Sequence, residues 1–180
     1  MQWRLVVAVV VVTGAAVADP VPDERLFEKI QSANAATRAE GARQLAKRAA
    51  AGQEHAIELA QEAAISNDPK VRGPLLDALI AAKKIDKATA ALVPTASVLE
   101  KKIRQLLRKD SAENLPVAKD CRITGGTAKG ATLECNARRC DRCDAIRRSF
   151  RVTTGVRWTI DKDQSSRRDD GSCGHCMSEF

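Results

Sequence analysis

The sequence predicts an α+β protein, in which a helical region precedes a small cysteine-rich antiparallel β module. Apolar residues recur at spacings of three and four up to about residue 110, the period of a helix with one buried face. After residue 116 apolar and polar residues alternate, which is the period of a strand. All six cysteines also fall in this second part. We expect the division to lie at Asn114-Leu115-Pro116, because proline cannot continue a helix.

Residues 1–18 have the pattern of a secretory signal peptide. Arg4 precedes an apolar run from Leu5 to Val12, and Ala16-Val17-Ala18 is a small-residue cleavage motif before Asp19. The run is shorter than the roughly 20 residues that a membrane-spanning helix needs. We therefore expect a periplasmic or secreted protein with no membrane span after cleavage. Such compartments permit disulfides.

The charge of the chain is +7 at neutral pH, and the C-terminal third is rich in arginine. Arginine-rich surfaces favour carboxylates and phosphates. A nucleic-acid partner is not expected for an exported chain. The sequence has no Tyr, and Trp158 is the single Trp after the signal peptide, so a stacking platform for bases is hardly available. The expected partner is another protein.

The helical region, residues 19–114, predicts five to six helices with short connections. Their expected caps and breaks are Asp23 as a first N-cap, Asn34 or Thr37 as the next, Gly52 as a terminator, Asp68 before Pro69, and Asp86, with Pro94 interrupting the helix that follows. The last helix is expected from Ser97 to Lys109. The residues expected to face inward are Leu26, Phe27, Ile30, Ala39, Ala42, Leu45, Ala46, Ala49, Ala56, Ile57, Leu59, Ala60, Ala63, Ala64, Val71, Leu75, Leu76, Leu79, Ile80, Val98, Leu99, Ile103, Leu106 and Leu107.

The helical region also carries an internal repeat. Arg38 and Arg72 lie 34 residues apart, and each is followed seven residues later by a leucine. This period is in the range of helical-hairpin solenoids. The stretch from Asn67 to Ala82, with its Asp-Pro start, Val-Arg pair and leucine-rich face, resembles a HEAT-type repeat. Over residues 34–110 the resemblance implies antiparallel helix pairs in a short arc and a scaffolding role, and a plain helical bundle is the alternative.

The β module, residues 115–180, begins with a predicted hairpin from Asp120 to Asn136. Ile123 and Leu133 fall on the apolar face of their strands. If they face each other, Cys121 faces Cys135 on the same side of the sheet. Opposed Cβ atoms on antiparallel neighbours lie about 4.5–5.5 Å apart, close to disulfide reach. The alternation therefore predicts a Cys121–Cys135 disulfide.

A second hairpin is predicted over residues 146–160. A three-residue loop, Thr153-Thr154-Gly155, would place Val152 opposite Val156 and Phe150 opposite Trp158, with glycine in a left-handed conformation. This register also predicts an arginine face on the other side of the hairpin, formed by Arg147, Arg151 and Arg157.

The other four cysteines form two C-x2-C pairs, Cys140 with Cys143 and Cys173 with Cys176. Structural disulfides are the favoured interpretation, because a module of about 60 residues commonly needs cross-links. A tetrahedral zinc site with four thiolates is the first alternative. Spacing does not select a pairing.

Thiol chemistry is the second alternative. Cys173-Gly-His-Cys176 resembles the redox motif of disulfide isomerases, and the resemblance implies Cys173 as nucleophile and Cys176 as resolving cysteine. Ser172 precedes the motif where that family has Trp, and no βαβ pattern surrounds it. In the zinc interpretation, His175, which lies between these two cysteines, could replace one of them as a ligand.

No other group of residues predicts catalysis. His55 lies beside Glu54 and Glu58 on a polar helix face, which favours a surface position. Asp161 and Asp163 could hold calcium, although nothing in their spacing requires it. We therefore expect a non-enzymatic scaffold or protein-binding protein without a cofactor. Its partner would contact the concave helical face or the arginine face.

Overall fold

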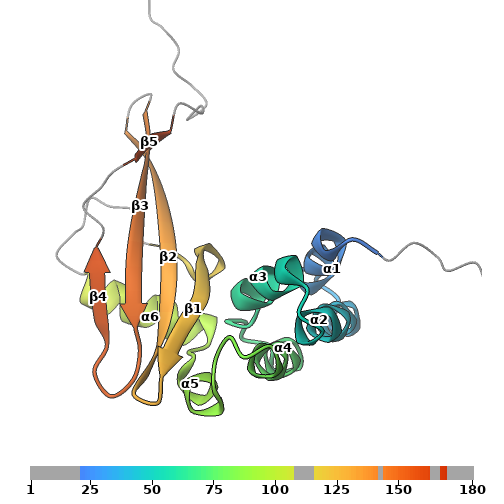
Figure 1. Cartoon of the computed structure of the whole chain (residues 1–180). Coiled ribbons are helices and arrows are strands. Elements are labelled where there is room, and N and C mark those ends of the chain that lie inside the picture. Colours follow the sequence, from blue (N-terminus) through green and yellow to red (C-terminus); the bar gives the residue numbers. More distant parts are fainter. Residues whose placement is uncertain (1–20, 108–115, 142–143, 163–166, 170–180) are drawn as a thin grey trace, which may run out of the picture.

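The computed structural model describes residues 21–107, 116–141, 144–162 and 167–169. Six helices in this part of the chain precede an antiparallel sheet, so the predicted α+β class is confirmed (Figure 1). The predicted signal peptide and the predicted division near Asn114 lie outside the described residues. So do Cys143, Cys173, His175, Cys176 and Asp163.

The helices begin and end close to the positions that the sequence marks. They are α1 (Asp23–Ile30), α2 (Ala35–Ala50), α3 (Glu54–Ala63), α4 (Pro69–Ala81), α5 (Lys87–Leu92) and α6 (Ala96–Leu106). The side chains of Asn34, Asp68 and Asp86 accept hydrogen bonds from backbone N–H groups in the first turns of α2, α4 and α5. These bonds satisfy donors that the start of a helix leaves without a partner. At α1, Pro22 occupies the N-cap position, and Asp23 instead contacts Arg48 on α2.

The inward stripes of the first four helices form one buried cluster. Its largest members there are fully buried: Leu26, Leu45, Leu75 and Leu79. Helix α2 packs against α1, α3 and α4. In α6 the prediction holds for Leu99, Ile103 and Leu107, which are buried, but it is wrong for Val98 and Leu106. Since the buried three recur every four residues, they form a narrow stripe, and the other two lie beside it.

The connection between α3 and α4 ties three helices together. The Arg38 guanidinium of α2 lies 3.0 Å from the Asp68 carboxylate, and it also donates to the carbonyls of Ser32 and Ala33. Asn67 Oδ1 accepts from the backbone N–H and the hydroxyl of Ser97, each at 3.0 Å, at the start of α6. Two adjacent side chains therefore fix α2, α4 and α6 relative to one another.

The sheet follows the short 3₁₀ helix η1 (Ala118–Asp120). Its strands are β1 (Cys121–Thr127), β2 (Gly130–Asp141), β3 (Asp144–Thr153), β4 (Thr159–Lys162) and β5 (Arg167–Asp169). Strands β1 to β4 are neighbours in sequence order. Strands β4 and β5 both pair with the edge of β3 that lies away from β2, β4 with the C-terminal part of β3 and β5 with its N-terminal part. Figure 1 shows α6 behind the sheet and α3 beside β1. The residues Ile123, Leu133, Phe150 and Val152 continue the buried cluster of the helices.

The register of the first hairpin is the predicted one. Ile123 faces Leu133 and Cys121 faces Cys135. The two cysteines form a disulfide, which confirms the predicted bond. Both are buried, so the bond belongs to the core under the sheet.

The predicted second hairpin is wrong. Val152 faces Ile160, and Phe150 faces Lys162. The connection is a five-residue loop, residues 154–158, in which Val156 is fully exposed. Arg157 also lies in this loop, so the arginine face does not form as predicted, and the exposed Arg151 faces Asp161 across the strands.

A buried threonine explains the longer loop. The Thr154 hydroxyl donates to the Leu92 carbonyl at the end of α5 at 2.8 Å, and it accepts from the Ala131 N–H at 3.0 Å. These bonds draw the chain back over the start of β2 instead of into a tight turn. Gly155 follows with a φ of 129°, so the prediction of a glycine conformation there is confirmed.

The longest hairpin was not part of the prediction. Strands β2 and β3 pair over ten residue pairs, from Thr132–Thr153 to Asp141–Asp144. The polar and arginine-rich sequence of this segment hides the alternation that identifies a strand. As a result the backbone of Cys140 lies near the far end of a hairpin.

Candidate functional site

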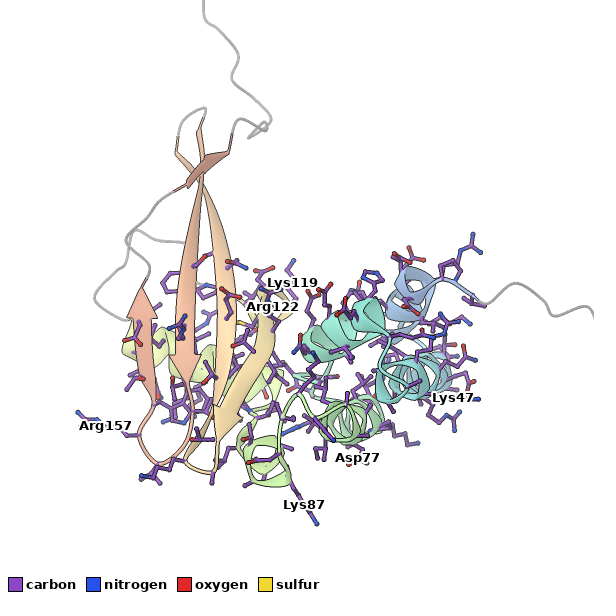
Figure 2. The ribbon with its side chains drawn as sticks, in the orientation of Figure 1. Lys47, Asp77, Lys87, Lys119, Arg122 and Arg157 are labelled. Carbon is purple, nitrogen blue, oxygen red and sulfur yellow. A yellow bond between two sulfur atoms is a disulfide. The ribbon has the colours of Figure 1, made fainter. Side chains whose placement is uncertain are left out.

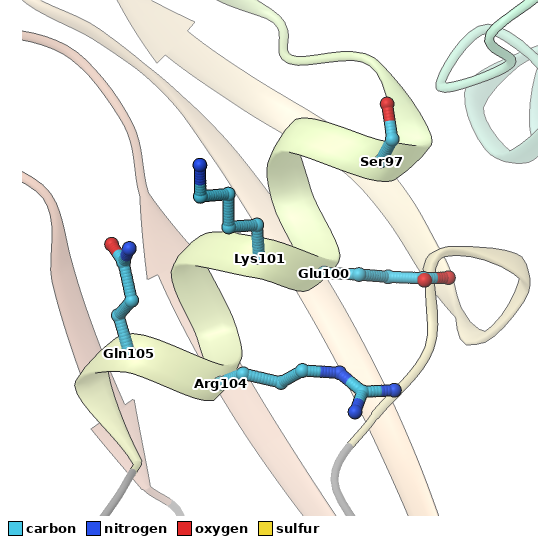
Figure 3. A pocket seen from close by; sticks show the side chains of 5 residues that line it. All are labelled: Ser97, Glu100, Lys101, Arg104 and Gln105. Atoms are coloured by element: carbon cyan, nitrogen blue, oxygen red, sulfur yellow. The ribbon is translucent and has the colours of Figure 1, made fainter.

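The outward side of α6 is the candidate site. Ser97, Glu100, Lys101, Arg104 and Gln105 line a shallow, open depression of about 450 Å³ (Figure 3). On the neighbouring side of the helix, Val98, Lys102 and Leu106 follow one another at four-residue spacing, so that they are neighbours on the helix surface. We call these eight residues the α6 surface.

Two large apolar side chains of the α6 surface are only half-buried. Val98 is 47% exposed and Leu106 is 46% exposed. In the described residues, the other large exposed apolar side chains are Val21 and Val156. Single exposed apolar residues are ordinary on protein surfaces. Here two of them lie on the same side of one helix, next to cationic groups. That combination distinguishes this surface from scattered exposed apolar residues.

The charge of the α6 surface is positive. Lys101 and Arg104 are exposed, and within the described part of the chain neither makes an ion pair. The carboxylate of Glu100 accepts a hydrogen bond from the Ala118 N–H at 3.1 Å. That bond directs the one negative group of the surface toward η1. Figure 3 shows Glu100 and Arg104 extending to one side of the helix, with Lys101 and Gln105 on another.

Helix α6 is a rigid support for this surface. Asn67 holds its N-terminal end through Ser97, and Glu100 joins its middle to η1. Leu99 and Ile103 are fully buried on the opposite side. A partner would therefore meet a preformed surface and would not have to order the helix on binding.

The structure brings together Cys121 and Cys135, the one cysteine pair that the sequence predicted specifically. The backbone of Cys140 lies in β2, opposite Ala145 of β3. Cys143, Cys173 and Cys176 lie outside the described residues, so their zinc, redox and disulfide interpretations stay predictions. Among the residues that the structure describes, no group of three His, Cys, Asp or Glu side chains could hold a metal ion.

The histidine predicted at the surface is there. His55 on α3 is half-exposed, and its Nε2 atom lies 3.0 Å from a carboxylate oxygen of Glu24 on α1. Nearby, burial raises the pKa of the Glu62 carboxyl, and the positive charge of Arg122 lowers it in part. Arg122 in turn donates to Glu134 at 2.8 Å, and this bond raises the pKa of the guanidinium. These contacts join α3 to α1 and β1.

Sequence reasoning missed the α6 surface because it assigned Val98 and Leu106 to the core. The helical positions contained a usable signal. Leu99, Ile103 and Leu107 recur every four residues and already make a complete apolar stripe. With Val98 and Leu106 added, the stripe is wider than one face of the sheet can cover.

Comparison of the chain with family models, with curated proteins and with solved structures found no match. Among the helices that the structure describes, none is long and apolar enough to cross a membrane.

Proposed function

We propose that this protein is an exported, non-enzymatic scaffold that binds an acidic amphipathic segment of another protein at the α6 surface. The observation that carries the proposal is the half-exposure of Val98 and Leu106 with Lys102 between them and Lys101 next to Val98, while Arg104 extends the positive charge around the helix. A segment with carboxylates and apolar side chains would complement both parts of this surface. Its apolar groups would cover the two exposed side chains, and its carboxylates would lie by the cations.

The helical region supplies the scaffold. Helix α2 packs against α4, and the two arginines of the repeat, Arg38 and Arg72, lie on these two helices. Packing of each helix on its counterpart one period later is typical of helical-hairpin solenoids. It supports the HEAT-like interpretation of residues 34–110.

Export rests on two features. The N-terminal segment has the pattern of a cleavable signal peptide. The Cys121–Cys135 disulfide, buried in the core, is of a kind that persists in oxidising compartments. Both are compatible with a periplasmic or secreted protein.

A photo-crosslinking amino acid at position 98 tests the binding site. We expect an adduct with a second protein in the native compartment, joined through a peptide of net negative charge. The double variant Lys101→Glu/Arg104→Glu should remove the adduct, because it places carboxylates against carboxylates. The matched control is the crosslinker at Lys47, which lies on α2, away from the sheet and from α6 (Figure 2).

Three results would contradict the proposal. One is a crosslink from position 98 only to the chain's own residues, because the surface would then be covered internally. Another is an adduct that persists unchanged in the charge-reversed variant. The third is an equal yield of the same adduct from position 47.

A further inference from the structure

The exposed apolar residues of the α6 surface belong to one row along the helix. Val98, Lys102 and Leu106 follow one another at intervals of four residues, so they lie on one side of α6. At about 1.5 Å per residue, Val98 and Leu106 are about 12 Å apart along the helix axis. Each of the two is about half-exposed. A segment that covers both must therefore extend for about 12 Å in the direction of α6.

Helix α6 lies across the strands and not along them. It contacts η1, which precedes the edge strand β1, and it also contacts β4 at the other side of the sheet. Four strands at a spacing of about 4.8 Å are about 14 Å wide. The 11 residues of α6 are about 16 Å long, enough to cross them. The crossing is visible in Figure 1 and, from close by, in Figure 3.

This direction decides which backbone conformation the bound segment has. An extended segment satisfies its backbone N–H and C=O groups by pairing with the edge of a sheet. Strand β4 is an edge strand in the described residues, but it runs across α6, so a segment paired with it could not follow the row from Val98 to Leu106. An extended segment along α6 would leave buried backbone groups without partners, which is costly. A helix satisfies these groups within itself.

The charges beside the row favour an acidic helix. Lys102 lies within the row, and Lys101 is a neighbour of Val98 on the helix surface. Successive helical residues are about 100° apart around the axis, so Glu100 and Arg104, each two positions from Lys102, project from the opposite side. Glu100 accepts its hydrogen bond from η1 on that opposite side. Of the charged residues of α6, the two lysines are therefore the ones that a segment on the row would meet.

The α6 helix of a second copy does not fit the row. In a symmetric pair the same surface of both copies meets, so Lys101 and Lys102 would face the lysines of the other copy. Like charges in an interface are unfavourable. The row therefore favours a partner helix of opposite charge.

We propose that the segment bound at the α6 surface is an acidic amphipathic α-helix of another protein, aligned with α6. Its apolar residues, seven or eight positions apart, cover Val98 and Leu106, and its carboxylates lie beside Lys101 and Lys102. The crossing angle is near the roughly 20° of aligned helix pairs, because at about 50° two helices separate within a shorter distance than the row. The inference rests on the proposed function, since it concerns the same site.

Photo-crosslinking from both ends of the row tests the inference. A crosslinking amino acid stands at position 98 in one full-length exported variant and at position 106 in another. Mass spectrometry of the digested adducts identifies the partner residue attached in each. We expect both variants to capture one partner, at residues seven or eight positions apart. An extended segment rises about 3.3 Å per residue, so its two attachment points would be about four positions apart.

Two charge reversals supply the matched control. Lys102→Glu changes a residue of the row, so it should lower the adduct yield from position 98 about tenfold through repulsion of the partner's carboxylates. Arg104→Glu makes the same change of charge on the other side of α6, and it should lower the yield less than about twofold. Equal losses in the two variants would overturn the inference, because binding would then depend on net charge and not on contact along the row.

The adducts also separate the inference from the proposed function. Attachment points about four positions apart, or in two unconnected segments of the partner, would overturn the helix, while partner binding at the α6 surface stands. If neither position gives an adduct with another protein, or if both capture only the same chain or a second copy of it, the proposed function fails and the inference fails with it.

Discussion

The helices α2, α4 and α5 are started by hydrogen bonds between residues two or three positions apart, as in the cap that Asp68 gives to Lys70. Bonds of the sheet part join residues that lie much further apart in the sequence. Thr154 reaches Ala131 over 23 positions and Leu92 over 62. The helical part can therefore form its elements locally and then pack them, whereas the sheet part needs distant segments to meet before its turns have their final shape.

Glycine should show this difference most sharply. A Cβ atom on Gly130, at the start of β2, would lie 1.9 Å from the Thr154 carbonyl oxygen. A Cβ atom on Gly73, in α4, would meet nothing within 4 Å. We expect Gly130→Ala to lower the free energy of unfolding by more than about 3 kcal/mol, because backbone must move on both sides of the contact.

The matched variant Gly73→Ala should raise the free energy of unfolding by about 0.5–1 kcal/mol, since alanine loses less conformational freedom in a helix. Denaturant unfolding followed by circular dichroism measures both changes. A Gly130→Ala variant as stable as the parent chain would mean that the β3–β4 loop does not lie against the start of β2.

The sequence distance between bonded residues also explains which features could be predicted: those set by near neighbours could, and those set by distant residues could not. The helix starts at Asn34, Asp68 and Asp86 follow from local cap chemistry, and the Cys121–Cys135 bond follows from alternation within one short hairpin. The β3–β4 register does not follow, because it depends on Thr154 meeting the end of α5. A buried threonine that bonds two distant backbone groups has no signature in its neighbouring residues.

The candidate site shows the same limit. The stripe of α6 was predicted, but its width was not, because the width depends on how much of the helix the sheet covers. Val98 and Leu106 are half-exposed for that reason. The one sequence signal for this exposure is that both residues lie beside a stripe that Leu99, Ile103 and Leu107 already complete.

A smaller effect is expected at the connection that ties α2, α4 and α6. Asp68→Ala removes the cap of α4 and the partner of the half-buried Arg38, so the Tm should fall by about 4 °C. Asp68→Asn keeps a capping oxygen but loses the charge. It should recover most of the loss if the cap dominates, as measured by calorimetry. An unchanged Tm for Asp68→Ala would show that Asn67 and the core suffice to hold this connection.

The smallest effect concerns the boundary between the two regions, where Glu62 of α3 lies near Arg122 of β1. Burial raises the pKa of the Glu62 carboxyl above its ordinary value of 4.5, and Arg122 offsets only part of this. The folded chain therefore holds this proton at a pH where the unfolded chain has released it. The resulting contribution to stability is complete below the unfolded pKa and is lost as the pH rises through the folded pKa.

Glu62→Gln should consequently raise the free energy of unfolding slightly at pH 7, since water screens a carboxyl that is only partly buried, and this gain should shrink toward zero below about pH 4. Denaturant titrations at several pH values measure the difference. Glu54→Gln, at the exposed start of α3, is the control. It removes a charge that favours the helix N-terminus, so it should give no gain at pH 7. A loss of stability in Glu62→Gln at pH 7 would instead mean that attraction to Arg122 outweighs burial, and that the charged pair holds α3 against the sheet.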